Sequence, residues 1–213
     1  EPWEPASLVK MMTAYVAFDE LRAGHLSLEE KVLVSERAWR STGSRMFIEV
    51  GDHVTLSALL QGLIVQSGND AAVSIAEHVA GDEETFAQVM NQYANRLGME
   101  QTHYANATGM PHPDMHTTAY DTARLARALI DDFPEYYEWY SQRSFEYGGI
   151  VQHNRNPLLR RDDTVDGLKT GYTRSAGYNL TASAERAGMR LIAVVLGTER
   201  NDARAEQTHQ LLN

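Results

Sequence analysis

The sequence predicts an α+β fold in which helices cover an antiparallel sheet and an all-helical lobe lies across a cleft from it. Two observations support this fold. Apolar residues recur with helical spacing through most of residues 7–130, and β-branched residues alternate in several stretches after Pro134. A chain of 213 residues with 43% hydrophobic content can bury a large core. We therefore expect one domain over residues 1–213, with the helical lobe inserted over roughly residues 26–140.

The first predicted element is a helix from Ser7 to about Ala23, because Pro5 suits a first helical turn and Gly24 ends the pattern. Its apolar residues predict that it is central and buried. Asp70 is expected to cap a later helix. Within residues 26–140 the sequence predicts helices over residues 55–66, 71–80, 82–97 and 118–130. It also predicts a short strand over residues 32–34 and an ordered loop over residues 39–45.

The last third of the chain has the sequence pattern of β-strands. Gly188 suits a hairpin turn between the final two strands, and Asp202–Leu212 is expected to form a closing helix. The predicted strands are Ser144–Tyr147, Val165–Thr170, Tyr178–Ala184 and Met189–Thr198.

Charge and composition exclude several classes of function. The chain has 19 basic and 29 acidic residues, and its net charge of -10 opposes non-specific binding to nucleic acid or anionic lipid. It has no cysteine, so disulfides and thiolate metal sites are excluded. The longest strongly apolar run, Leu191–Leu196, is far too short to span a bilayer. No signal peptide precedes Ser7, and we expect that upstream sequence has been removed.

Ser7 and Lys10 form the first candidate site. They lie three positions apart, so on a helix the amine can reach the hydroxyl and act as a base for a serine nucleophile. Burial would favour the neutral amine, because desolvation lowers a lysine pKa. The spacing alone is common by chance, and a buried hydroxyl beside a surface lysine is the alternative. Lysine is scarce, however: only Lys10, Lys31 and Lys169 occur among the 19 basic residues.

Three motifs occur in order, namely Ser7-x-x-Lys10, Ser67-x-Asn69 and Lys169-Thr170-Gly171, and together they are the signature of penicillin-binding proteins and serine β-lactamases. Over essentially its whole length the chain resembles the catalytic domain of low-molecular-mass penicillin-binding proteins, the D-alanyl-D-alanine carboxypeptidases of bacterial cell walls. Other stretches that look like this family are Leu63–Ala71, His153–Asn156, Val165–Gly171 and Ala176–Leu180.

The resemblance implies a β-lactamase/DD-peptidase-like fold and assigns roles to the motif residues. Ser7 is the expected nucleophile that becomes acylated, and Lys10 the expected base, kept neutral by burial and by the positive Lys169. Ser67 would relay the proton to the leaving D-alanine. The backbone N–H groups of Ser7 and Tyr172 would form the oxyanion hole.

The resemblance also implies substrate contacts. Asn69 would contact Lys10 or the substrate amide. Lys169, Thr170 and Arg204 would hold the terminal carboxylate. Tyr172 replaces the His or Thr that often follows Lys-Thr-Gly, which leaves specificity open. Arg204 has an alternative as a solvated residue paired with Glu206.

By this resemblance the chain is a serine-type D-Ala-D-Ala carboxypeptidase that needs no cofactor and removes the terminal D-alanine from peptidoglycan stem peptides. Penicillins would inhibit it as covalent β-lactam ligands. A periplasmic or cell-envelope location is implied, with peripheral attachment to the outer face of the inner membrane through a segment absent from this chain. The family's N-terminal strands and any C-terminal β domain also lie outside the 213 residues.

Alternative functions stay open at this point. A DD-endopeptidase would share the same motifs, and a non-catalytic wall-binding protein would keep the cleft without turnover. A β-lactamase is disfavoured, because no Glu-x-x-Leu-Asn follows the Ser-x-Asn motif to activate water.

Other polar and aromatic groups have simpler explanations. His112–His116 holds metal-ligand residue types but lacks a third spaced ligand, so we interpret it as a surface loop and predict no metal site. Tyr136–Tyr140 is interpreted as packing between the lobes rather than as a sugar platform. Arg155 and Asp121 match family positions, but a structural pairing role suits them at least as well.

Overall fold

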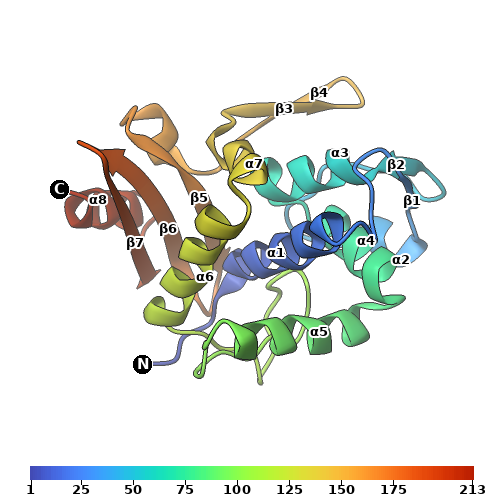
Figure 1. The fold of residues 1–213 in the computed structure, drawn as a ribbon, viewed down its shortest axis with the longest axis horizontal. Helices are drawn as coiled ribbons and strands as arrows, with labels where there is room; N and C mark the ends of the chain where they lie inside the picture. Colours follow the sequence, from blue (N-terminus) through green and yellow to red (C-terminus); the bar gives the residue numbers. More distant parts are fainter.

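The computed structural model describes residues 1–213 and confirms the predicted α+β fold. A three-stranded sheet lies at one end of the molecule and most helices lie at the other, with helix α1 (Val9–Arg22) between them (Figure 1). One hydrophobic core of 41 buried residues surrounds α1 and extends through the helical part. A second core of 9 buried residues lies between the sheet and the last helix.

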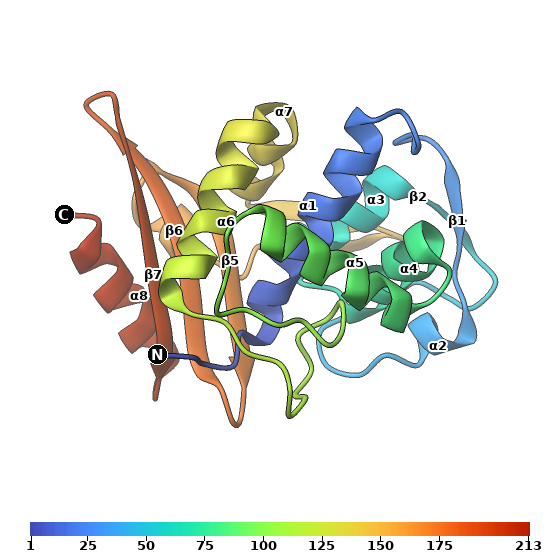
Figure 2. The same cartoon turned by 60° about the horizontal axis from the view of Figure 1, so that its bottom comes forward.

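The sheet consists of the antiparallel strands β5 (Val165–Thr173), β6 (Gly177–Arg186) and β7 (Met189–Thr198), in that order. Gly188 has φ +76° at the predicted hairpin turn, a conformation that glycine adopts without strain. Helix α8 (Asn201–Leu211) packs on β6 and β7. Figure 2 shows α8 and α6 on opposite faces of this sheet. Because the strand order is β5-β6-β7, β5 is an edge strand, and it contacts the turn that precedes α1.

Helix α1 is central, as its apolar composition predicts. Every residue from Val9 to Phe18 is buried, and the helix contacts α4, α5 and α6. A 3₁₀ turn, Ala6–Leu8, precedes it and carries Ser7. Side chains all around α1 are buried, which explains why its apolar residues do not form a single stripe.

Four of the five helices in the helical part, all except α4, have first turns capped by a side chain. Ser35, Thr55, Asp82 and Thr118 each accept a hydrogen bond from the backbone N–H three residues later. The helices are α2 (Glu36–Trp39), α3 (Leu56–Gln61), α4 (Asn69–Ala80), α5 (Glu83–Arg96) and α6 (Ala119–Asp132). A π-helical turn, Gly62–Gln66, continues α3 and ends at Ser67.

The prediction that Asp70 caps a helix from Ala71 is wrong. Helix α4 begins two residues earlier, with Gly68 at its N-cap, so Asp70 already lies in the first turn. Its carboxylate instead accepts hydrogen bonds from the backbone N–H groups of Met46 and Phe47, each at 3.0 Å. Asp70 therefore holds the preceding loop against α4.

The remaining strands form two small hairpins. β1 (Lys31–Leu33) pairs with β2 (His53–Thr55), and β3 (Ser144–Tyr147) pairs with β4 (Ile150–His153), which has no sequence-based prediction. Helix α7 (Pro134–Tyr137) precedes the second hairpin. No helix in the chain is both long and apolar enough to cross a bilayer.

The aromatic cluster around α7 lies against α1. The ring of Tyr136 stacks on that of Phe18, with centroids 4.7 Å apart, and Tyr140 is completely buried. The Tyr137 hydroxyl donates to Asp166 in β5 at 2.9 Å. These contacts are those of packing between the helical part and the sheet, as the sequence predicts.

Candidate active site

Ser7 and Lys10 meet at the start of α1. The Lys10 Nζ lies 2.9 Å from the Ser7 Oγ, because the 3₁₀ turn leads directly into the helix and places the two side chains one above the other. The same Nζ donates to the carbonyl oxygen of Thr108 at 2.7 Å. Lys10 is 1% exposed, so the amine has protein atoms around it and only these two neighbours within hydrogen-bonding distance.

Burial lowers the pKa of Lys10 from 10.5 to about 7, and the negative charge of Asp70 opposes part of this shift. A desolvated ammonium is destabilised relative to the neutral amine. Near neutral pH a large fraction of Lys10 is therefore unprotonated and able to accept the Ser7 proton.

Ser67 lies at the end of the π-helical turn with φ +65° and ψ +37°, a left-handed conformation that is uncommon for a residue with a Cβ. Its hydroxyl is buried and has no hydrogen-bond partner in the protein. A buried polar group without a partner costs stability, and such groups cluster at functional sites. The strained backbone places this hydroxyl in the cleft that also holds Ser7.

The cleft has a volume of about 510 Å³ and lies between the helical part and the edge of the sheet. Six of the eight predicted site residues line it, and the buried amines of Lys10 and Lys169 lie behind its wall. The lining site residues are Ser7, Ser67, Asn69, Thr170, Tyr172 and Arg204.

Asn69 follows Ser67 on the same turn and is nearly buried. Its Nδ2 donates to the carbonyl oxygen of Thr42 at 2.6 Å, whereas its Oδ1 has no partner. No hydrogen bond joins Asn69 to Lys10, so the structure does not show the predicted contact between them. The lone acceptor leaves Asn69 with hydrogen-bonding capacity for a ligand amide.

Strand β5 carries Lys169, Thr170 and Gly171 along the opposite wall. A Cβ on Gly171 would lie 3.0 Å from both the Pro5 carbonyl oxygen and the Ser7 amide nitrogen. Contacts this short are tighter than nearly all real Cβ contacts, so glycine favours the close approach of the edge strand to the turn that carries Ser7. The glycine of the third motif thus has a steric role of its own.

Lys169 is 2% exposed, and its Nζ donates to the carbonyl oxygen of Thr170 at 3.1 Å. Burial lowers its pKa well below 10.5, and the positive charges of Lys10, Arg155 and Arg204 lower it further. The family resemblance implied that burial and the positive charge of Lys169 together keep Lys10 neutral. Burial is the main cause at both lysines, and the repulsion between them favours a state in which they do not both carry a proton.

Arg204 projects from α8 to the end of the sheet. Its Nη1 donates to the carbonyl oxygens of Gly171 at 3.0 Å and Asn179 at 3.2 Å, and its Nε is buried without a partner. Burial lowers its pKa from 12.5 to about 10. The alternative of a solvated Arg204 paired with Glu206 is wrong, because the side chain is buried against backbone carbonyls.

The side chain of Tyr172 packs against Tyr178 of the neighbouring strand β6. Its ring stacks on Tyr178 across the strand pair, with centroids 4.2 Å apart, and is half exposed. Its bulk therefore lies along the rim of the cleft, and its backbone lies next to Gly171 in β5.

Several residues near the site were not predicted from the sequence to have a role there. Arg155, assigned no catalytic role from the sequence, lines the cleft and donates to the Ser44 Oγ at 3.0 Å. The Thr108 carbonyl holds Lys10, and a backbone group leaves no signal in a sequence. Asn179 is fully buried and donates to the carbonyl oxygens of Glu4 and Pro5, at 3.0 and 3.1 Å. Asn179 lies within Ala176–Leu180, a stretch that resembles the family, and this resemblance was the one feature of the sequence that could have indicated its importance.

Asp121 has the structural role that the sequence favoured. Its Oδ2 accepts from the Gln101 backbone N–H at 2.9 Å and from the Thr102 hydroxyl at 2.7 Å, away from the cleft. In the loop His112–His116, the Nδ1 of His112 lies 3.9 Å from the Oδ2 of Asp114, and both side chains are largely exposed.

Comparisons with known proteins agree with this geometry. A family model described as D-alanyl-D-alanine carboxypeptidase matches residues 1–200. D-alanyl-D-alanine carboxypeptidase DacD of Escherichia coli (strain K12) is 43% identical over 215 residues, which cover 98% of this chain and 55% of that protein. The chain thus spans about half the length of the curated relatives it matches.

Solved structures give the same result. Penicillin binding protein 5 from Haemophilus influenzae matches with a TM-score of 0.97 and 39% identity, over 100% of this chain and 63% of that one. Penicillin-binding protein D2 from Listeria monocytogenes, solved in an ampicillin-bound form, matches with a TM-score of 0.90 and 29% identity, over 100% and 87% of the two chains. The family match over nearly the whole chain therefore shows that it belongs to the D-alanyl-D-alanine carboxypeptidase family.

Proposed function

We propose that residues 1–213 form the catalytic domain of a serine-type D-Ala-D-Ala carboxypeptidase that removes the terminal D-alanine from peptidoglycan stem peptides. The observation that carries this proposal is the 2.9 Å approach of a buried lysine amine, with a pKa of about 7, to the Ser7 hydroxyl. This pair has the geometry and the protonation state of a nucleophile beside its general base. The names of the relatives support the same activity.

In the proposed acylation step, Ser7 Oγ attacks the carbonyl carbon of the penultimate D-alanine while Lys10 accepts the Ser7 proton. The backbone N–H groups of Ser7 and Tyr172 stabilise the oxyanion that forms. The Ser67 hydroxyl then passes a proton from Lys10 to the amine of the leaving D-alanine. The scissile C–N bond breaks, an ester to Ser7 forms, and Lys10 is again neutral.

Deacylation reverses these roles. Water attacks the ester carbonyl carbon, Lys10 and Ser67 take up its proton, and the Ser7 oxygen regains a proton as it leaves. One water is consumed for each D-alanine released.

The terminal carboxylate of the D-alanine that leaves is assigned to Lys169, Thr170 and Arg204. Thr170 and Arg204 line the sheet side of the cleft, and the buried Lys169 directly precedes Thr170 in β5. An incoming carboxylate would favour the protonated form of Lys169, because an opposite charge stabilises an ammonium. Asn69, with its unpartnered Oδ1, is assigned to the substrate amide on the opposite side.

We further propose that β-lactams acylate Ser7 and that the full-length protein acts in the cell envelope, peripheral to the outer face of the inner membrane. Relatives solved in ampicillin-bound and cefotaxime-bound forms support the first part. The domain is proposed as a single catalytic unit, in which the helical part between residues 26 and 140 is inserted ahead of the sheet strands.

The test is the intact mass of the protein after incubation with benzylpenicillin, beside the Ser7→Ala variant, followed by D-alanine release from a pentapeptide that ends in D-Ala-D-Ala. We expect an adduct of the drug's mass on the parent protein alone, and D-alanine release by the parent alone. Drug consumption without an adduct would indicate a β-lactamase. An adduct without D-alanine release would indicate an endopeptidase or a wall-binding protein. Either result, drug consumption without an adduct or an adduct without D-alanine release, contradicts the proposed carboxypeptidase.

A further inference from the structure

The segment from Tyr104 to Met110 carries the Thr108 carbonyl that holds Lys10, and it has no regular structure of its own. No backbone–backbone hydrogen bond involves any residue from Tyr104 to Met110. Buried backbone groups need partners, so side chains must supply them here. The position of the Thr108 carbonyl therefore depends on which side chains hold this segment.

Helices α1 and α5 and the segment itself supply these side chains. Asn91, in α5, holds Tyr104 at both its N–H and its carbonyl, at 2.7 and 2.8 Å. Asn106 accepts from the N–H of Gly109 at 2.8 Å and closes a turn within the segment. Between these points lies Ala107, directly before Thr108.

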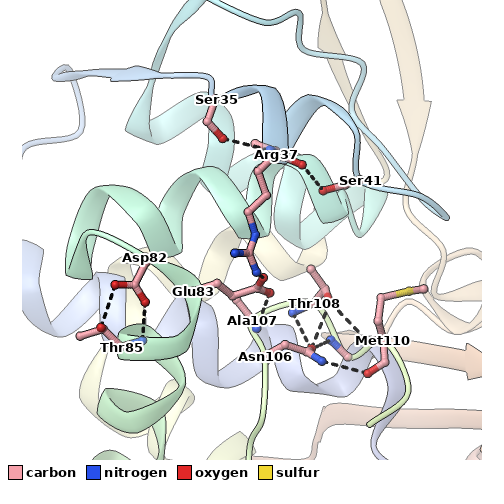
Figure 3. Close-up of polar contacts among 12 residues, drawn as sticks. Ser35, Arg37, Ser41, Asp82, Glu83, Thr85, Asn106, Ala107, Thr108 and Met110 are labelled. Carbon is pink, nitrogen blue, oxygen red and sulfur yellow. Dashed lines mark hydrogen bonds and ion pairs between the residues drawn. The ribbon is translucent and has the colours of Figure 1, made fainter.

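Ala107 is fixed from both sides. Its carbonyl accepts from the Thr13 hydroxyl of α1 at 2.8 Å, and its N–H donates to the Glu83 carboxylate at 3.1 Å. Glu83 is the first residue of α5, and its side chain is only 10% exposed. Its second oxygen accepts from Arg37 of α2 at 2.6 Å (Figure 3). Arg37 thus uses one oxygen of the carboxylate and leaves the other free to accept from the Ala107 amide.

We infer that Glu83 is a positioning residue for catalysis: through the Ala107 amide it aligns the Thr108 carbonyl, which in turn holds the Lys10 amine at the Ser7 hydroxyl. Glu83 touches neither nucleophile nor substrate site, and no sequence motif marks it. The path runs Arg37, Glu83, Ala107, Thr108, Lys10, and each of its non-covalent steps is a hydrogen bond of 3.1 Å or less.

The neighbouring Glu84 provides a matched control. Both glutamates line the same polar hollow beside the cleft, but the Glu84 side chain makes no hydrogen bond or ion pair. Glu83→Gln keeps an oxygen that can accept from Ala107 while removing the charge. Glu83→Ala removes both. Comparing the three variants separates the hydrogen bond from the charge.

The experiment measures benzylpenicillin acylation by stopped-flow or quenched mass spectrometry, resolved into the dissociation constant of the first complex and the acylation rate constant. We expect Glu83→Ala to lower the rate constant about tenfold with an unchanged dissociation constant, because a misplaced base slows proton transfer without changing ligand contacts. Glu83→Gln should recover most of the rate, and Glu84→Ala should match the parent.

The inference rests on the proposed acyl-enzyme function, and the design separates the two. A parent protein that forms no adduct contradicts the proposed function itself. A parent that acylates normally, with Glu83→Ala equal to it, overturns only the role of Glu83. Equal losses in Glu83→Gln and Glu83→Ala also overturn it, because the charge rather than the hydrogen bond to Ala107 would then matter. If Glu83→Ala fails to fold, Glu83→Asp takes its place, because the shorter side chain keeps the charge but no longer reaches the Ala107 amide. This variant must show the same loss of rate constant at an unchanged dissociation constant, and a normal rate overturns the inference.

Discussion

Gly109 lies directly against Ala6, so that a Cβ on Gly109 would be 1.9 Å from the Ala6 carbonyl oxygen and 2.8 Å from the Ser7 amide nitrogen. Gly109 also has φ +88°. Gly171 of β5 also lies against the turn that carries Ser7, so two glycines contact this turn closely. The close approach of three backbone segments fixes the direction in which Ser7 faces the cleft.

Gly109→Ala is expected to destabilise the protein by about 3 kcal/mol or more, because backbone atoms must move to admit the methyl group. Gly51→Ala is the control, since Gly51 has φ +84° but no atom lies within 4 Å of the place that its new methyl group would take. It should cost only about 1–2 kcal/mol, the penalty of a left-handed conformation for alanine. Urea unfolding measures both, and equal losses would contradict a steric role for Gly109.

Acylation by benzylpenicillin should slow as the pH falls below about 7. Lys10 has its pKa lowered to about 7 by burial, and only the neutral amine can accept the Ser7 proton. The neutral fraction falls with pH below this value, so the rate constant should drop about tenfold per pH unit on the acid side. A pH profile of the acylation rate constant measures this, and a rate that stays level down to pH 5 would exclude Lys10 as the base.

Asp70→Asn is expected to shift the acid side of this profile to lower pH. The Asp70 carboxylate raises the pKa of Lys10, so removing its charge lets that pKa fall further and keeps the amine neutral in more acidic solution. One of the two loop amides at Met46 and Phe47 also loses its acceptor, at a cost of about 1–3 kcal/mol in unfolding free energy.

Asp52→Asn is the comparison for that variant. Asp52 accepts a backbone N–H in the same loop, from Glu49, and its charge is not among the causes that shift the pKa of Lys10. This variant should leave the pH profile in place. A shift of the profile to higher pH in Asp70→Asn would contradict the electrostatic role of Asp70.

Arg204→Ala should reduce the preference for a free terminal carboxylate. The parent is expected to cleave a peptide ending in D-Ala-D-Ala with a kcat/KM at least tenfold above that of its C-terminal amide, since an ion pair is lost with the amide. In Arg204→Ala the two substrates should differ less than threefold. A ratio is measured within one preparation, so a change in the folded fraction does not affect it. Arg200→Ala, at the exposed start of α8, should retain the preference of the parent.

Much of the fold was predictable because it depends on local patterns. Gly188 at the hairpin, Asp82 before α5 and the buried run of α1 all follow from spacing and from the conformations that single residues permit. The short strand β4 was not predicted, because its exposed apolar residues Ile150 and Val151 give no alternation.

The site was predictable only in part. Ser7, Lys10, Ser67 and Lys169 are marked by side-chain chemistry in a known order, whereas the Thr108 carbonyl acts through the backbone. Asp70 shows a different difficulty, since an aspartate near a helix start has the same appearance in a sequence whether it caps that helix or holds a loop. Tertiary structure alone separates the two.

The bonds from Asn179 to the carbonyls of Glu4 and Pro5 have a consequence for the order of synthesis. Ser7 is translated well before β6, whose Asn179 side chain anchors the turn that carries Ser7 and lies 175 residues after Glu4. Ser7 and Lys10 can pair as soon as their helix forms. We expect the packed turn to form only after β5 and β6 have been made and have docked, so the Ser7 site would become reactive late and as a whole rather than gradually during translation.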